Sequence, residues 1–165
     1  MNKTVRQYIG LLAALVSYYI IHEGAHLVYA LSIGVFKAIK FMGLGMQIDV
    51  YAEKMSQIQM GIFCICGSIA TAVVAYLMVI FVGKIVKHPS KVFKAVMYYV
   101  TIALLLLDPV YLSVLYQFFG GGDMNGILFL IPEKIAQTGY GILLVINGLV
   151  FWKCVLPKYK NAFQE

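Results

Sequence analysis

Charged residues are scarce in this sequence: Asp, Glu, Lys and Arg together make up 12% of its 165 residues. Soluble domains average about 25% charged and about 45–50% apolar residues, whereas 62% of this chain is apolar. The shortage of charge therefore excludes an ordinary water-soluble domain. The length allows one domain, and about four helical membrane spans of about 20 residues would occupy most of it. We expect a single integral membrane domain over residues 1–165.

Cysteine and acidic residues are also few. Cys64, Cys66 and Cys154 are odd in number and lie in apolar segments, which argues against a disulfide framework. Seven acidic residues stand against 13 basic ones, which gives a net charge of +6. Because the basic residues stand beside long apolar runs, we expect the lipid bilayer, and no nucleic acid, as their partner.

Four apolar stretches are long enough to cross a bilayer as helices, since each residue adds about 1.5 Å. They cover about residues 8–33, 55–83, 92–119 and 138–156. The first stretch continues past Ile21 without a convincing cleavage site, so we interpret it as a retained span rather than a signal peptide. The expected fold is an all-α polytopic membrane protein with about four transmembrane helices.

A different pattern follows the first stretch. Apolar and polar side chains alternate over residues 46–51, as in a half-buried strand. Turn residues precede this segment at 43–45, and residues 35–41 can form the partner strand. We predict a short membrane-associated β-hairpin over about residues 35–51; an extended surface loop is the alternative.

The basic residues are unevenly distributed between the two sides of the predicted bundle. The side with both termini and the connection between the second and third spans carries nine of the 13 Lys and Arg residues. The positive-inside rule places that side, and so both termini, in the cytoplasm. The nine residues are Lys3, Arg6, Lys84, Lys87, Lys91, Lys94, Lys153, Lys158 and Lys160.

Histidine occurs only three times, yet two of the three stand four residues apart within the first predicted span. On a helix, His22 and His26 project from one face, about 6 Å apart along the axis, so both imidazoles can reach one tetrahedral zinc ion. Glu23 can approach a zinc-bound water and act as its general base without binding the metal. This arrangement is typical of zinc hydrolases. Hydrogen-bonded side chains inside a helix bundle are the alternative.

A catalytic zinc ion needs a third protein ligand and one open position, and a carboxylate is the natural candidate. Asp123 follows three glycines, whose backbone can fold back toward the metal. Asp108 lies in the middle of the third span at a depth similar to that of His22, where an unpaired aspartate would be costly. A polar bond between helices at a Pro109 kink is the structural alternative for Asp108. The residues alone leave both aspartates open.

The segment His22-Glu23-Gly24-Ala25-His26 resembles the first motif, His-Glu-x-x-His in a transmembrane helix, of the site-2 protease family of membrane-embedded zinc metalloproteases. Residues 41–45 look similar to a Gly-x-Gly element in the short β-region of that family. Residues 122–128 resemble the family's Leu-Asp-Gly segment, with Gly126 displaced from the position after the aspartate. The family's Asn-x-x-Pro element is not visible in this chain.

The resemblance implies a zinc metalloendopeptidase that hydrolyses a peptide bond in a transmembrane or membrane-adjacent substrate. Glu23 would then activate the zinc-bound water, and His22, His26 and Asp123 would bind one catalytic Zn2+ ion, with Asp108 as the alternative third ligand. The family commonly has its active site nearer the cytoplasm, so the resemblance and the charge count disagree on sidedness. The alternative function is a non-catalytic membrane pseudoprotease or a metal-binding scaffold or regulator.

The predicted hairpin suggests how such a substrate would be held. A membrane helix protects its own amides, so it must unwind before a protease can reach them. An edge strand formed by Gln47, Ile48, Asp49 and Val50 can bind the unwound segment as an additional strand. We treat these four residues as the candidate substrate-binding residues.

Overall fold

Four helical segments are long and apolar enough to cross a membrane in the part of the chain that the structure describes. The structure is a computed structural model, and it describes residues 2–43, 45–120 and 122–164. The four segments are Lys3–Ser32, Gln57–Ile85, Lys91–Phe119 and Glu133–Gln164. The prediction of an all-α polytopic fold with about four spans and one β-hairpin after the first span is confirmed.

Capping side chains satisfy the first backbone N–H groups of the first two spans and so set where these helices begin. Helix α1 (Lys3–Ser32) begins five residues before the predicted span, where the Asn2 side chain accepts the N–H of Thr4 at 3.1 Å. Helix α2 (Gln57–Ile85) begins with a capping box between Ser56 and Gln59. Polar residues in the first turn of α1 carry no transmembrane signal, so hydropathy alone placed its start too far inside. Helix α2 instead begins two residues after the predicted residue 55.

The third and fourth spans are interrupted by wider π-helical turns. The third consists of α3 (Lys91–Val110), η2 (Tyr111–Leu115) and α4 (Tyr116–Phe119), and a short helix, α5 (Gly122–Ile127), follows. The fourth consists of α6 (Glu133–Val150), η3 (Phe151–Val155) and α7 (Leu156–Gln164), so it extends past the predicted 138–156 at both ends.

Pro109 lies inside α3 and leaves one carbonyl without its helical donor. Proline has no N–H, so Leu105 O, four residues earlier, cannot form the usual helical hydrogen bond. Asn147 of α6 donates its Nδ2–H to Leu105 O at 2.6 Å, and its own Oδ1 accepts the hydroxyl of Tyr76 at 2.7 Å. A buried amide from a neighbouring helix thus replaces the missing donor and fixes α6 against α3 at this point.

The hairpin consists of β1 (Phe36–Met42) and β2 (Gly45–Val50), which pair in antiparallel fashion with Ile39 opposite Ile48. This agrees with the hairpin predicted over about residues 35–51; Leu44, in its predicted turn, lies outside the described residues. Ile48 is buried and Gln47 is exposed, as the alternating pattern predicts.

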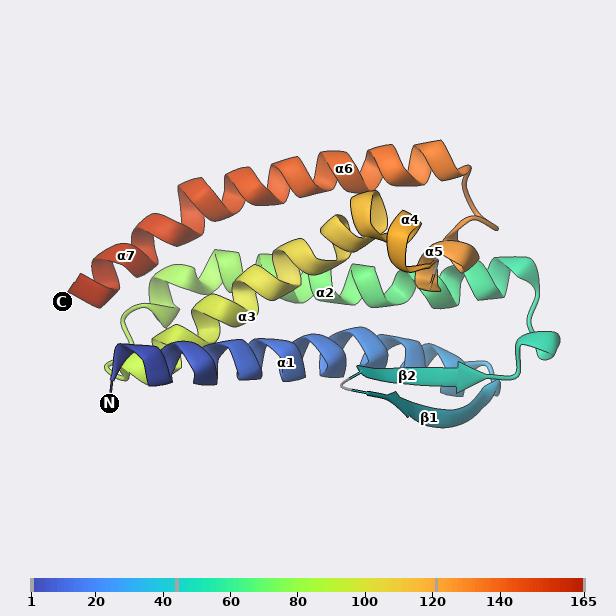
Figure 1. The fold of residues 1–165 in the computed structure, drawn as a ribbon, viewed down its shortest axis with the longest axis horizontal. Helices are drawn as coiled ribbons and strands as arrows, with labels where there is room; N and C mark the ends of the chain where they lie inside the picture. The colour runs from blue at the N-terminus through green and yellow to red at the C-terminus, as the bar shows by residue number, and fades with distance from the viewer. Residues whose placement is uncertain (1, 44, 121, 165) are drawn as a thin grey trace.

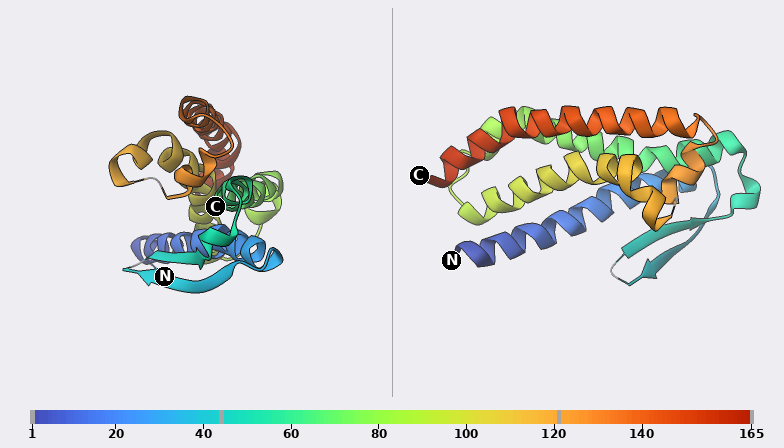
Figure 2. Two further views of the ribbon diagram at one scale, coloured as in Figure 1. Left: turned by 90° about the vertical axis from the view of Figure 1, so that its right-hand side faces the viewer. Right: turned by 45° about the horizontal axis from the view of Figure 1, so that its top comes forward.

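The two ends of the bundle are different in character (Figure 1). Both termini lie at one end, whereas the hairpin and the connection between α5 and α6 lie at the other. Both views in Figure 2 show the hairpin beside the C-terminal half of α1, with α6 on the opposite side of the molecule. A buried apolar cluster that includes Ala30, Ile48, Phe63, Met124 and Ile127 joins α1, β2, α2 and α5 at this end. The candidate site lies beside this cluster.

Candidate metal centre

Three ionisable side chains of α1 lie together in the interior. His22, Glu23 and His26 are all buried, and each offers one metal-binding atom within 4.8 Å of the others. The imidazole ring centroids of His22 and His26 are 4.9 Å apart, as expected for residues one helical turn apart. The structure therefore brings together the histidine pair predicted from the spacing, in a group that could hold a metal ion.

Asp123 meets the two histidines from α5, although it lies 101 residues beyond His22 in the chain. Its Oδ2 atom is 2.9 Å from Nε2 of His22 and 3.4 Å from Nε2 of His26. Atoms bound at about 2.0–2.1 Å to one tetrahedral zinc ion lie about 3.3 Å from each other. Both N···O distances are therefore close to the separation of two ligands of a single ion.

Local backbone geometry brings α5 to this position. Gly120 and Gly122 have φ angles of 94° and 33°, which L side chains rarely adopt, and Tyr111 donates its hydroxyl to Gly120 O at 2.7 Å. A Cβ at Gly126 would lie 2.3 Å from Cys64 Sγ, so only glycine allows α5 to approach α2 this closely. The glycine run was expected to let the chain turn toward the metal; its middle residue, Gly121, lies outside the described residues.

Asp123 belongs to α5, in the connection between the third and fourth spans. Burial acts to raise its pKa, but contacts with the imidazoles of His22 and His26 outweigh burial and hold that pKa at about 2. About a fifth of its side chain, 21%, remains exposed. Asp123 is therefore an ionised, accessible carboxylate, which is the form that binds a metal ion.

Asp108 lies on the other side of the His22 ring. Its Oδ1 atom is 3.2 Å from Nδ1 of His22, without a well-aligned hydrogen bond, and accepts the hydroxyl of Tyr18 at 2.5 Å. Its Oδ2 atom accepts the hydroxyl of Thr71. The depth argument correctly predicted that Asp108 lies near His22, but its carboxylate contacts the nitrogen opposite the one that faces Asp123. Asp108 thus faces the opposite side of the imidazole from Asp123, a position from which a carboxylate can orient the ring.

His26 has an equivalent partner that the sequence did not reveal. Its Nδ1 atom is 2.7 Å from the main-chain carbonyl of Phe63 in α2. An N–H at Nδ1 donates to this oxygen and leaves the lone pair of Nε2 directed toward Asp123. Because the partner is a main-chain carbonyl, no residue type in the sequence could have indicated it.

Glu23 is held by the hairpin. Its Oε2 atom accepts the backbone N–H of Ile48 in β2 at 3.0 Å. This contact places the strand edge directly beside the metal-binding atoms. The sequence predicted both the glutamate and the strand but gave no indication that they touch.

Gly67 of α2 lies directly against the Nε2 atoms of the two imidazoles. A Cβ at this position would lie 2.6 Å from Nε2 of His26 and 2.7 Å from Nε2 of His22. Carbon atoms do not approach nitrogen so closely, so glycine is required for the rings to take these positions. The space that this glycine leaves adjoins the two nitrogens that would bind the ion.

A cavity of about 350 Å³ opens onto these groups. Of the four candidate substrate-binding residues, Gln47 and Ile48 line it, and Asp49 and Val50 do not. Asp49 instead pairs with Lys40 at 2.8 Å, and this contact lowers the pKa of the Asp49 carboxyl. Sequence reasoning missed three tyrosines in the lining, because tyrosines are abundant throughout the chain: Tyr18, Tyr19 and Tyr111.

Comparisons with family models, with curated proteins and with solved structures give no match to this chain. The relation to the site-2 protease family therefore depends on the residues and their arrangement alone. The buried histidine and glutamate group and its neighbouring aspartates are the observations from which a function must be argued.

Proposed function

We propose that this chain is an intramembrane zinc metalloprotease similar to the site-2 proteases. The observation that carries the proposal is the position of Asp123, whose Oδ2 lies 2.9 Å from Nε2 of His22 and 3.4 Å from Nε2 of His26, close to the separation of two ligands of one tetrahedral ion. Glu23, which is not needed to complete that set, lies next to it. Two histidines, one carboxylate and a separate glutamate form the residue set of a hydrolytic zinc site.

Each residue has a defined role in the proposed reaction. His22, His26 and Asp123 hold the ion, while Asp108 and the Phe63 carbonyl orient the two imidazoles. A bound zinc ion supplies a Lewis acid that polarises the peptide carbonyl and lowers the pKa of water. Glu23 would accept a proton from the attacking water and give that proton to the amide nitrogen as the C–N bond breaks, so that the leaving group departs as a neutral amine.

The hairpin supports a binding mode for the substrate. Ile48 directs its N–H toward Glu23 rather than toward β1, so this edge of β2 faces the cavity. An unwound segment of a membrane protein, or a membrane-adjacent peptide, can add to this edge as a further strand and bring its scissile bond to the site. Gln47 and Ile48 are the residues of the predicted edge strand that would contact it.

The surroundings of the site agree with a reaction in or at the bilayer. The site lies among helices that are long and apolar enough to span a membrane. We propose a multi-pass protein with both termini in the cytoplasm, as the distribution of Lys and Arg favours. Reporter fusions at the two termini test this orientation: periplasmic or luminal activity at either end contradicts it.

A metal-binding scaffold or regulator without catalytic activity is the second candidate. One contact favours it: the hydrogen bond from Ile48 gives the Glu23 carboxylate a structural role that does not require chemistry. A scaffold would need the metal ligands but would not depend on the carboxylate as a base.

Glu23→Gln separates the two functions. The purified full-length protein is placed in liposomes with single-span test substrates that carry helix-breaking residues, and cleavage is followed by mass spectrometry. A protease loses cleavage by about 10²–10⁴-fold, as for other general bases, while the variant retains its zinc. Cleavage that persists in the variant excludes Glu23 as the base, and a wild-type protein that binds zinc without cleaving any substrate favours the scaffold.

A further inference from the structure

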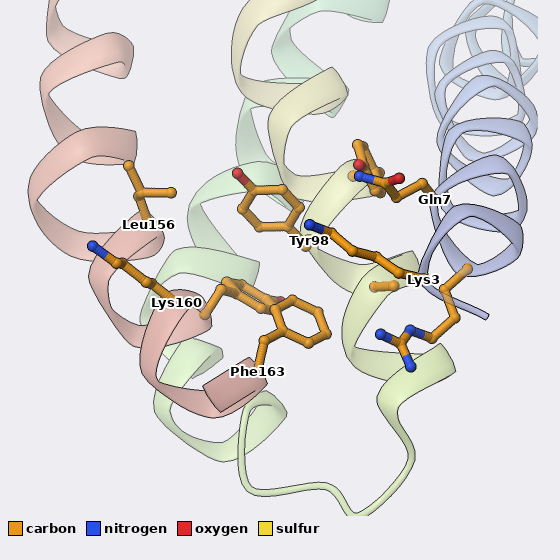
Figure 3. Close-up of a pocket in the computed structure, with 10 residues that line it drawn as sticks. Lys3, Gln7, Tyr98, Leu156, Lys160 and Phe163 are labelled. Carbon is orange, nitrogen blue, oxygen red and sulfur yellow. The ribbon is translucent and has the colours of Figure 1, made fainter. Parts of the chain in front are cut away.

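A second cavity lies at the end of the bundle that holds both termini, far along α1 from the histidines (Figure 3). Its volume is about 480 Å³. Lys3 and Gln7 of α1 face Lys160 and Phe163 of α7 across it, and Tyr98 of α3 lies between the two helices. Three helices that are distant in the sequence thus form one pocket.

The end of the bundle around this pocket is strongly basic. Nine Lys and Arg residues belong to it. The acidic residues that the structure describes all lie in the hairpin or the short turn after it, in the interior near the histidines or around α5 and α6; residues 2–22, 54–107 and 134–164 contain none. No acidic side chain of the described segments therefore neutralises the lysines that line the pocket, Lys3 and Lys160.

The pocket is preformed by contacts between α3 and α7. The ring of Tyr159 contacts those of Tyr98 and Phe163, with centroids 5.1 Å and 6.3 Å apart. Lys94, which is buried, donates from Nζ to Ala162 O at 2.8 Å near the end of α7. A cation bonded to a carbonyl at the C-terminal end of a helix is favourable. These contacts fix α7 against α3, so the pocket does not need a ligand to form.

We propose that this pocket binds the phosphate headgroup of an anionic phospholipid. The ammonium groups of Lys3 and Lys160 and the amide of Gln7 are donors for phosphate oxygens. The aromatic wall of the pocket, formed by Tyr98, Tyr159 and Phe163, provides apolar surface together with Leu156. The first part of an acyl chain can lie on this surface. This inference is independent of the proteolytic function, because the pocket shares no residue with the metal centre.

The position of the pocket favours a lipid over a soluble anion as its ligand. It lies at the ends of segments that are long enough to span a bilayer, which is where headgroups are found. Basic pockets between transmembrane helices are a known way to bind anionic headgroups, and each lysine near an anionic surface contributes a measurable part of the affinity. A phosphate ester with an acyl chain would contact both the basic and the aromatic walls, whereas inorganic phosphate would contact only the basic one.

The test compares two double variants of equal net charge. Lys3→Gln with Lys160→Gln removes the two pocket lysines, and Lys87→Gln with Lys158→Gln removes two exposed lysines of the same end that do not line the pocket. The full-length protein, in a neutral detergent, is titrated with phosphatidylglycerol or phosphatidylcholine, and bound lipid is counted by native mass spectrometry. Each variant is shown to be folded by comparing its thermal unfolding temperature without added lipid, and its zinc content, with those of the wild type.

We expect the wild-type protein to retain one phosphatidylglycerol. Its affinity for this lipid should fall about thirtyfold in the pocket variant, or about fivefold per lysine, and should stay nearly unchanged in the control variant. Equal losses in both variants would indicate general attraction to a basic surface and overturn the proposal. Equal binding of phosphatidylcholine, or displacement of the lipid by an equal concentration of inorganic phosphate, would also overturn it. Zinc content should be the same in all variants. A negative result for lipid binding would therefore not count against the proposed metal centre.

Discussion

Oδ1 of Asp108 lies 3.2 Å from Nδ1 of His22, on the side of the imidazole that faces away from Asp123. A carboxylate at this position fixes the orientation and tautomer of a metal-binding histidine without touching the metal. Tyr18 and Thr71 donate hydroxyl groups to the same carboxylate and hold it in place. One buried aspartate thus links three helices to the orientation of a single ring.

Asp108→Asn should weaken zinc binding without abolishing it. The variant keeps the shape of the side chain but removes the negative charge beside His22, and loss of such an outer partner typically costs about 10–100-fold in metal affinity. Competition with a chromogenic zinc chelator measures the change, with Asp49→Asn in the hairpin as the control. Unchanged affinity in Asp108→Asn would show that this carboxylate has no part in positioning His22.

Gly67→Ala should remove the metal from an otherwise folded protein. Its added Cβ would lie 2.6–2.7 Å from both Nε2 atoms and must push the imidazoles apart. Gly83→Ala is the matched control in the same helix, because a Cβ there meets no atom within 4 Å. Zinc content measured on both purified variants decides the point. A Gly67→Ala protein with full zinc content would mean that the imidazoles do not bind metal in the arrangement described.

Ile48→Pro should reduce cleavage while leaving the metal in place. Proline removes the N–H that donates to Glu23 and so frees the general base from the strand edge that is proposed to hold the substrate. A hydrogen bond to a charged group contributes about 1.5–3 kcal/mol, which corresponds to a fall of about 10–100-fold in turnover. Ile48→Val keeps the N–H and controls for the side chain. Turnover in the proline variant equal to that of the valine variant would rule out a role for this amide.

Much of this architecture was predictable from the sequence because it depends on local patterns. Hydropathy gave the four spans, alternation over residues 46–51 gave the hairpin, and the four-residue spacing placed His22 and His26 on one face. The glycines before Asp123 indicated a segment that could turn toward the metal. Each of these predictions needs only the residue types and the geometry of one element.

The missing parts of the site depend on packing between elements. The Phe63 carbonyl and the Ile48 amide are main-chain groups that every residue carries, so no sequence pattern distinguishes them. Gly67 is one of 15 glycines, and only the close approach of α2 to the imidazole nitrogens shows why this position has no side chain. Asp108 was predicted near the correct depth, but depth does not tell which ring nitrogen it faces.

Asn147→Ala should destabilise the fold at the Pro109 kink. The variant leaves Leu105 O buried without a donor, which costs about 1–3 kcal/mol. Adding Pro109→Ala should recover part of that loss, because alanine restores the helical N–H that proline lacks. Denaturant or thermal unfolding in detergent compares the single and double variants. A double variant no more stable than Asn147→Ala would show that the amide does not replace the missing donor.

The most direct test of the account is the zinc content of the purified wild-type protein beside that of Asp123→Ala. We predict about one zinc ion per chain in the wild type, since two histidines and one carboxylate complete a three-ligand site. Asp123→Ala should lose most of it, whereas Asp108→Ala should retain part. A wild-type protein without stoichiometric zinc, or an Asp123→Ala variant that keeps all of it, would contradict the metal centre described here.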